Sequence, residues 1–202
     1  LDHLGIASAD FGTSTPSGEY HSAYDDLHMM RNHLDPGYRY HEVAAAFAGT
    51  FALRMAGSDI APMVYSDYAT AVEGHLANLD AKQADSRVVD LAPAYEAARE
   101  WRAAAAELER AARTARGERA EAINDALIAQ ERALTQPEGL PGRSWYKHTV
   151  YAPGLYTGYA VQPLSAIDDA ISAGDAETAR EYRDLLVDSL REATEEAREA
   201  LS

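Results

Sequence analysis

The sequence predicts an all-α protein, a bundle of long helices interrupted by one extended loop. Residues 93–134 are rich in alanine and charged residues, and they contain only one glycine, Gly117. Glycine and proline gather instead in residues 137–163, which hold eight of the 21 in the chain. In the C-terminal segment, apolar residues recur every three or four positions, as on one face of a helix. The members of this stripe are Tyr182, Leu186, Leu190, Ala193, Ala197 and Leu201.

The N-terminal part is predicted to be mixed. Residues 4–8 fit a short buried strand, and residues 13–18 form a Ser/Thr/Pro/Gly loop. A first helix is predicted from about residue 24 to residue 34. Asp35-Pro36 pairs a good N-cap with a residue suited to the first helical turn, so a second helix is expected from there to about Gly57.

The second helix combines large apolar residues with several alanines, which predicts burial on most of its sides. Asp67 is expected to cap a third helix that ends near Asp80. Residues 93–134 are predicted to form two helices that break near Gly117. The last helix is expected to start at the Gly174-Asp175 cap and to run to the end of the chain.

The loop between residues 137 and 163 is unusually long for a helical domain and unusually aromatic. Its aromatic residues and histidine are Trp145, Tyr146, His148, Tyr151, Tyr156 and Tyr159. Composition leaves two interpretations open: a connector packed on the bundle, or a functional loop.

Composition excludes several functional classes. The chain holds 33 acidic against 18 basic residues, a formal net charge of −15, which argues against nucleic acid and anionic membrane surfaces as partners. There is no cysteine, so disulfides, thiolate catalysis and cysteine-type zinc sites are excluded. No apolar run reaches the roughly 20 residues that a membrane-spanning helix needs.

The sequence does not contain a self-contained active site of a recognisable kind. Gly-x-Ser-x-Gly, His-Glu-x-x-His, phosphate-binding glycine loops and the paired Glu-x-x-His motifs of di-iron bundles are all absent. A histidine without neighbouring ligands is more often structural than a metal ligand. The seven histidines are scattered: His3, His21, His28, His33, His41, His75 and His148.

Two segments, however, resemble the C-terminal third of the glutamate carboxypeptidase II family of zinc peptidases, whose non-peptidase relative is the transferrin receptor. The first is EYHSAYD at 19–25, followed by DPGYRYH at 35–41. The second begins at Glu131 and includes LPGR at 140–143, YKH at 146–148, VYAP at 150–153 and GYA at 158–160. The resemblance extends over nearly the whole chain and is weakest between about residues 81 and 125.

This resemblance implies a helical bundle of the transferrin-receptor-like dimerisation domain type. Residues 1–23 are then a non-helical C-terminal remnant of the peptidase domain, and residues 24–202 form the helical dimerisation domain, including the pocket loop at 137–163. The bundle is expected to form a homodimer, with the upstream peptidase domain and a peptide substrate as further partners in the parent protein. The family also favours an extracytoplasmic or membrane-anchored parent.

The resemblance implies two residues of a two-zinc active site. His21 takes the position of the last zinc ligand, where a neutral imidazole nitrogen binds the metal. Tyr20 takes the position of a catalytic phenol that donates to the developing oxyanion. The other ligands and the general base are expected upstream, so zinc is expected in the full-length parent, and this chain alone is expected to be inactive and without a cofactor.

The aromatic loop is implied to form one wall of the substrate pocket. Gly158 and Tyr159 take the positions of a Lys-Tyr pair that holds a C-terminal glutamate in the family. Tyr159 is kept, but glycine replaces the lysine that would pair with a carboxylate. The resemblance therefore predicts an aminopeptidase or carboxypeptidase with a less acidic preference.

Two other interpretations stay open. The chain is alternatively the dimerisation and partner-binding domain of a non-catalytic, receptor-like relative, which would have no need to keep His21. It is otherwise an unrelated helical interaction module, in which residues 1–35 would pack as a complete element. If it is a piece of a longer peptidase, Leu4 and Ile6 are expected to be poorly covered.

Overall fold

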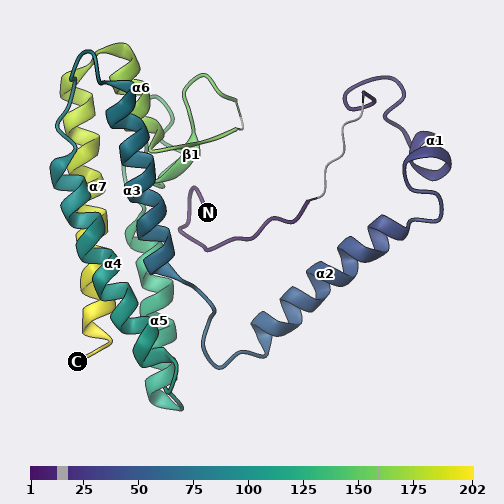
Figure 1. Ribbon diagram of the computed structural model, residues 1–202, viewed down its shortest axis with the longest axis horizontal. Coiled ribbons are helices and arrows are strands. Elements are labelled where there is room, and N and C mark those ends of the chain that lie inside the picture. The colour runs from purple at the N-terminus through teal and green to yellow at the C-terminus, as the bar shows by residue number, and fades with distance from the viewer. Residues whose placement is uncertain (13–17, 159) are drawn as a thin grey trace. The chain divides into compact units, whose positions relative to one another are not determined.

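The computed structural model describes residues 1–12, 18–158 and 160–202. These residues are mostly helical, with two short strands, which confirms the predicted all-α class (Figure 1). They form two compact units: residues 1–7 together with 59–202, and residues 8–58. The boundary predicted at residue 24 between a peptidase remnant and a helical domain stays a prediction.

The larger unit is built on four long helices that run side by side (Figure 1). They are α3 (Tyr65–Lys82), α4 (Ala92–Ala112), α5 (Glu118–Ala133) and α7 (Ala176–Glu199). Helix α4 packs against α3 and α7, and α5 packs against α7. Fully buried large side chains fill the core between them: Leu76, Trp101, Leu108, Ile123, Leu186 and Leu190.

Local residues explain where several of the helices begin and end. Asp175 caps α7, and its carboxylate accepts hydrogen bonds from the Glu177 and Thr178 N–H groups. The predicted break near Gly117 is confirmed, because α4 ends at Ala112 and α5 begins at Glu118. The third helix begins at Tyr65, so Asp67 lies inside its first turn and is not the cap that was predicted.

A nine-residue helix and a hairpin were not predicted. Strands β1 (Tyr151–Pro153) and β2 (Val161–Pro163) pair antiparallel within the aromatic loop. Helix α6 (Ser165–Ala173) follows directly and packs on α7 and β1. A small apolar cluster of Leu140, Ala152 and Ala166 lies beneath the loop.

The N-terminal segment is tied to the same unit, but not as a strand. The Asp2 carbonyl accepts hydrogen bonds from the Lys147 and His148 N–H groups, at 2.7 and 3.1 Å. The His3 ring stacks on Trp145, with centroids 4.0 Å apart, and its Nδ1 lies 2.7 Å from the Trp145 carbonyl oxygen. These contacts hold residues 1–7 at the start of the aromatic loop.

The prediction of a buried strand at residues 4–8 is wrong. Leu4 and Ile6 are 63% and 54% exposed, and the residue that packs inward is Gly5. Gly5 has a φ of 58°, and a Cβ there would lie 2.9 Å from the Arg132 Cα. Only a residue without a side chain fits this close approach to α5.

The smaller unit contains α1 (Leu27–Met29), a π-helical turn η1 (Met30–Leu34) and α2 (Arg39–Ala56). Asp35 does not start α2 directly, because the N-cap is Tyr38. Its buried carboxylate nevertheless accepts hydrogen bonds from the Tyr40 and His41 N–H groups and contacts the His41 ring. Most of the loop predicted at residues 13–18 lies outside the described residues.

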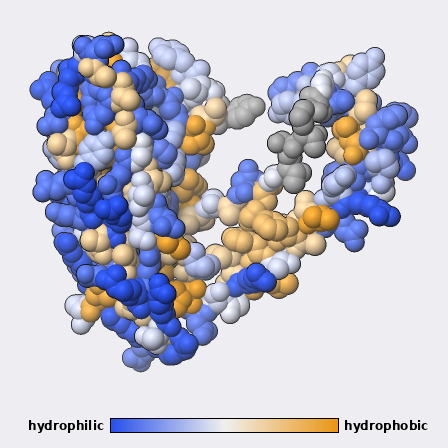
Figure 2. Space-filling model, in the orientation of Figure 1, coloured by the Kyte–Doolittle hydropathy of each residue, from blue (hydrophilic) through white to orange (hydrophobic). Residues whose placement is uncertain are grey.

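The predicted burial of α2 is not found within its own unit. No residue of this helix is buried, and Figure 2 shows a largely hydrophobic surface along it. Its most exposed large apolar side chains are Tyr40, Val43, Phe47 and Leu53. Within the unit, Phe11 packs edge-on against Phe47 and Phe51, with ring centroids 5.1 and 4.9 Å apart. None of the described helices combines the length and apolar character required to cross a membrane.

Candidate functional site

Tyr20 and His21 lie together in a turn that precedes α1. Both side chains are exposed, and their rings stack with centroids 3.8 Å apart. His21 adopts a left-handed backbone conformation with a φ of 61°, and its N–H donates to Asp25 Oδ2 at 3.4 Å. A left-handed backbone conformation is uncommon for residues other than glycine. The backbone of this turn therefore sets the direction in which the imidazole projects.

His21 is the predicted metal donor at this position. Across the described stretches of the chain, no group of three or more His, Cys, Asp or Glu side chains gathers where it could hold an ion. The exposed imidazole of His21 is a suitable zinc donor. A zinc ion held by His21 would need further donors from outside the described residues.

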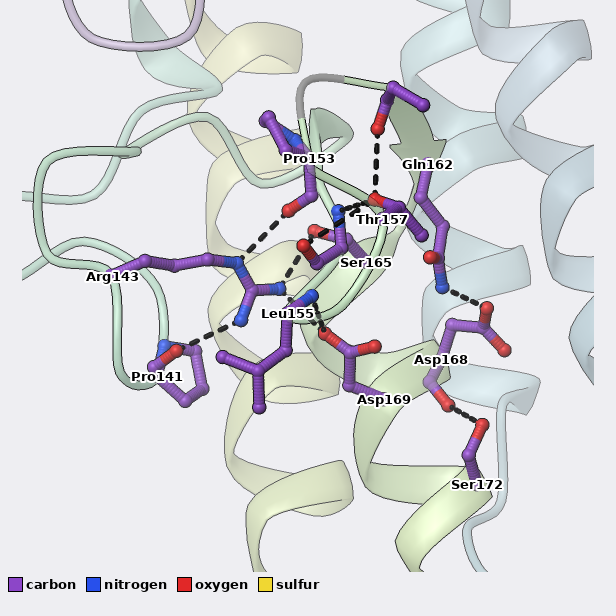
Figure 3. Close-up of polar contacts among 12 residues, drawn as sticks. Pro141, Arg143, Pro153, Leu155, Thr157, Gln162, Ser165, Asp168, Asp169 and Ser172 are labelled. Carbon is purple, nitrogen blue, oxygen red and sulfur yellow. Dashed lines mark hydrogen bonds and ion pairs between the residues drawn. The ribbon is translucent and has the colours of Figure 1, made fainter.

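The aromatic loop is organised around the guanidinium group of Arg143 (Figure 3). Its Nε donates to the Pro153 carbonyl oxygen at 3.0 Å, and Nη1 donates to the Pro141 carbonyl oxygen at 2.9 Å. Nη2 donates to Asp169 Oδ2 at 2.7 Å and to Ser165 Oγ at 3.3 Å. One side chain thereby joins the start of the loop, the end of β1 and the first turns of α6.

Asp169 connects the same group to the tip of the hairpin. Its Oδ2 also accepts the Leu155 N–H at 3.0 Å (Figure 3). Thr157 Oγ1 accepts the Gly154 N–H at 2.8 Å and donates to the Ala160 carbonyl oxygen at 3.0 Å. The base of the hairpin is thus held by hydrogen bonds on both sides, whereas Leu155, Tyr156 and Gly158 are exposed.

A buried polar pair holds the strand that leads into this hairpin. The Val150 and Tyr151 N–H groups both donate to His148 Nδ1, at 3.1 and 3.0 Å. Because Nδ1 accepts, the ring proton is on Nε2, which donates to Glu131 Oε1 at 3.1 Å. Tyr65 Oη donates to the other Glu131 oxygen at 3.3 Å.

The surroundings of the Glu131 carboxylate are aromatic. Burial, followed by the nearby Glu131 charge, raises the pKa values of Tyr65, Tyr68 and Tyr151 above their usual range. Tyr151 stacks on Tyr68 and its Oη lies 3.1 Å from His75 Nε2, where burial lowers the pKa of the imidazole. His148 is fully buried and Glu131 nearly so. The role of this network is therefore to hold the aromatic loop in place.

The predicted site residues therefore fall in two places. Tyr20 and His21 belong to the smaller unit, and Gly158 belongs to the hairpin of the larger unit. Gly158 has a φ of 63°, and no atom lies within 4 Å of where its Cβ would be. Tyr159 lies outside the described residues.

Sequence reasoning missed the residues that organise the loop. Arg143, His148 and Glu131 were quoted for their resemblance, without a role, and Asp169 was not singled out. The spacing of Ile167, Ala170 and Ile171 after a proline is a weak helical signal that would have indicated α6.

A comparison with family models decides the family. The model for the transferrin receptor-like dimerisation domain matches residues 89–198, which include α4 to α7 and the whole aromatic loop. The chain belongs to the transferrin receptor-like dimerisation domain family. The Arg143 and Asp169 contacts and the His148–Glu131 pair all lie within this dimerisation domain.

Curated relatives extend the similarity beyond the dimerisation domain. The chain is 30% identical to a probable glutamate carboxypeptidase LAMP1 of Arabidopsis thaliana and 32% identical to a probable glutamate carboxypeptidase VP8 of Zea mays, in each case over 85% of this chain and 25% of the relative. It is also 32% identical to the aminopeptidase NAALADL1 of Rattus norvegicus, over 76% of this chain and 23% of that protein. The chain thus spans about a quarter of the length of these relatives.

Proposed function

We propose that this chain is the dimerisation and substrate-pocket domain of a longer two-zinc exopeptidase. The observation that carries the proposal is the family match over residues 89–198, next to relatives named as carboxypeptidases and as an aminopeptidase. Dimerisation is the role that the family name gives to the bundle. Catalysis, zinc binding and peptide substrates are proposed for the longer protein and not for this chain alone.

In this proposal, His21 donates one imidazole nitrogen to zinc, and the remaining ligands and the general base come from elsewhere in the longer protein. Zinc, when bound, polarises the scissile carbonyl and lowers the pKa of a bound water. Tyr20 donates its phenolic proton as a hydrogen bond to the oxyanion that develops on the substrate. Their adjacency supports these roles, because both rings are exposed on one short turn.

The aromatic loop is proposed to supply one wall of the substrate pocket, with Gly158 and Tyr159 among the contacting residues. Exposed groups at the hairpin tip on a hydrogen-bonded base suit such a wall. Gly158 also leaves open space where other residues would project a side chain. The isolated 202-residue chain is proposed to be a dimer without peptidase activity of its own.

The test of the zinc site uses the full-length protein and three variants. His21→Ala is expected to lower the zinc content measured by atomic spectroscopy and to abolish hydrolysis of peptides. Tyr20→Phe is expected to keep zinc and to lose about 10²–10³-fold in kcat, as expected for one oxyanion donor. His28→Ala, which changes another exposed histidine of the same unit, is the matched control and should change neither quantity. Unchanged zinc and activity in His21→Ala would refute the assignment.

The test of dimerisation uses sedimentation of the 202-residue chain. A dimer mass at micromolar concentration supports the proposal, and a monomer at all concentrations contradicts it. A dimer whose full-length form has no zinc and no peptidase activity would instead favour the non-catalytic receptor-like alternative.

A further inference from the structure

The hairpin formed by β1 and β2 is an uncharged surface. Residues 149–163 contain no Asp, Glu, Lys, Arg or His. The exposed large side chains that the structure describes there are apolar or aromatic: Leu155 is 45% exposed, Val161 58% and Tyr156 92%. A ligand that contacts this hairpin therefore meets hydrocarbon, aromatic rings, backbone groups and the uncharged polar side chains of Thr157 and Gln162.

The cation that touches the hairpin is not available to a ligand. Arg143 is only 10% exposed, and every nitrogen of its guanidinium group donates to a protein acceptor. Lys82 pairs with Asp168 at the N-terminal part of α6, and the same carboxylate accepts from Gln162. Each of these two cations is thus already paired with a carboxylate of α6, although the Lys82 side chain is 42% exposed.

The same contacts fix the position of the tip. Asp169 accepts one hydrogen bond from Arg143 and one from the Leu155 N–H, so a single carboxylate oxygen joins the base of the hairpin to its turn. Within the turn, the Gly154 N–H donates to Thr157 Oγ1 at 2.8 Å. Leu155 and Tyr156 consequently lie in a turn whose position is fixed by hydrogen bonds.

We propose that Arg143 and Asp169 are positioning residues that hold Leu155 and Tyr156 as an uncharged contact for the terminal side chain of a peptide substrate. The substrates this arrangement favours have an aliphatic or aromatic terminal residue, and glutamate or aspartate is disfavoured. An acidic side chain on this surface loses water without gaining a cation, which costs free energy. This inference rests on the proposed function, in which the loop lines the substrate pocket.

The positioning role is tested first on the 202-residue chain by amide hydrogen exchange. Asp169→Ala removes both acceptor contacts and is expected to speed exchange of the Leu155 N–H by about 10-fold or more, the scale of one lost hydrogen bond. Asp169→Asn keeps an oxygen acceptor and is the milder variant, expected to stay within about 3-fold of wild type. Arg183→Lys is the matched control, because Arg183 is a similarly covered arginine that bonds Asp184 and Asp90.

Substrate choice is tested on the full-length protein with peptides that differ only in the terminal residue. Leucine and phenylalanine are expected to exceed glutamate in kcat/KM by about 10-fold or more, in the range of one hydrophobic pocket contact. Asp169→Ala is expected to raise KM for the leucine peptide with kcat little changed, and Asp169→Asn to restore it. Arg183→Lys should behave as wild type.

The outcomes separate this inference from the function on which it rests. A zinc-loaded wild-type protein that hydrolyses no terminal residue overturns the proposed function and the substrate assignment with it. An active protein that prefers glutamate, or whose Asp169→Ala variant keeps both the wild-type KM and the wild-type exchange rate, overturns this inference alone.

Discussion

Replacing His148 by phenylalanine is expected to destabilise the larger unit by several kcal/mol. His148 is fully buried, and its Nδ1 is the acceptor for the Val150 and Tyr151 N–H groups. Phenylalanine is another planar aromatic ring, but it is larger, accepts no hydrogen bond and removes the Nε2 donor of Glu131. A buried donor left without a partner costs about 1–3 kcal/mol, so the two donors together predict a loss of about 2–6 kcal/mol. That is a large part of the roughly 5–15 kcal/mol that stabilises a typical domain.

The assay is urea unfolding followed by tryptophan fluorescence. Both tryptophans, Trp101 and Trp145, belong to the larger unit, so the signal reports on that unit alone. The denaturation midpoint is expected to fall while the slope with urea stays constant, which indicates a change in stability and not in the denatured state.

A second histidine variant is the control. His75 has one side-chain partner, the Tyr151 hydroxyl, so His75→Phe is expected to cost about 0.5–1.5 kcal/mol, the usual net value of one hydrogen bond. Glu131→Gln is expected to be similarly mild, because the amide oxygen still accepts the proton on His148 Nε2. A loss below about 1 kcal/mol in His148→Phe, or one equal to that of His75→Phe, would refute the assigned role of the two backbone donors.

Three further predictions concern the same unit. Trp101→Phe leaves the buried Gln130 Oε1 without its donor and is expected to lower stability by about 1–3 kcal/mol in the same assay, and an unchanged midpoint would contradict this. Burial lowers the folded-state pKa of His75, so its contribution to stability is complete above about pH 6.5 and is lost as the pH falls from there through the lowered pKa. The wild type should therefore lose more stability between pH 7 and pH 5 than the His75→Gln variant. Equal losses would contradict the assigned effect of the lowered His75 pKa. Gly139→Ala is expected to lower the thermal midpoint further than Gly158→Ala, because both residues have positive φ but only at Gly139 does a Cβ meet a backbone oxygen, at 2.3 Å.

Much of the bundle could be predicted from the sequence because helical periodicity is a local signal. The stripe of α7 and the break near Gly117 depend on residues a few positions apart, and the structure has both. The burial predicted for α2 is not found within its own unit, for a related reason. Its apolar pattern indicates that the helix forms, but periodicity does not identify what covers the helix, and within the described chain its residues are exposed.

The loop could not be predicted to the same depth, because its contacts are long-range. Arg143 and Asp169 are separated by 26 positions, and their pairing depends on α6 lying beneath the hairpin. His148 and Glu131 are 17 positions apart. Amino-acid composition does not show that a histidine is buried. Tyr20 and His21 were found only through family resemblance, and their catalytic roles stay predictions.

The larger unit is discontinuous in sequence, and this has a consequence for how the chain acquires its structure. Residues 1–7 emerge from the ribosome well before their partners at Arg132 and at residues 145–148. The smaller unit lies between them as an insertion, and closing a loop of roughly 50 residues costs about 3.5 kcal/mol of chain entropy. Residues 1–7 are therefore expected to become ordered only after the bundle has formed the surface that receives them.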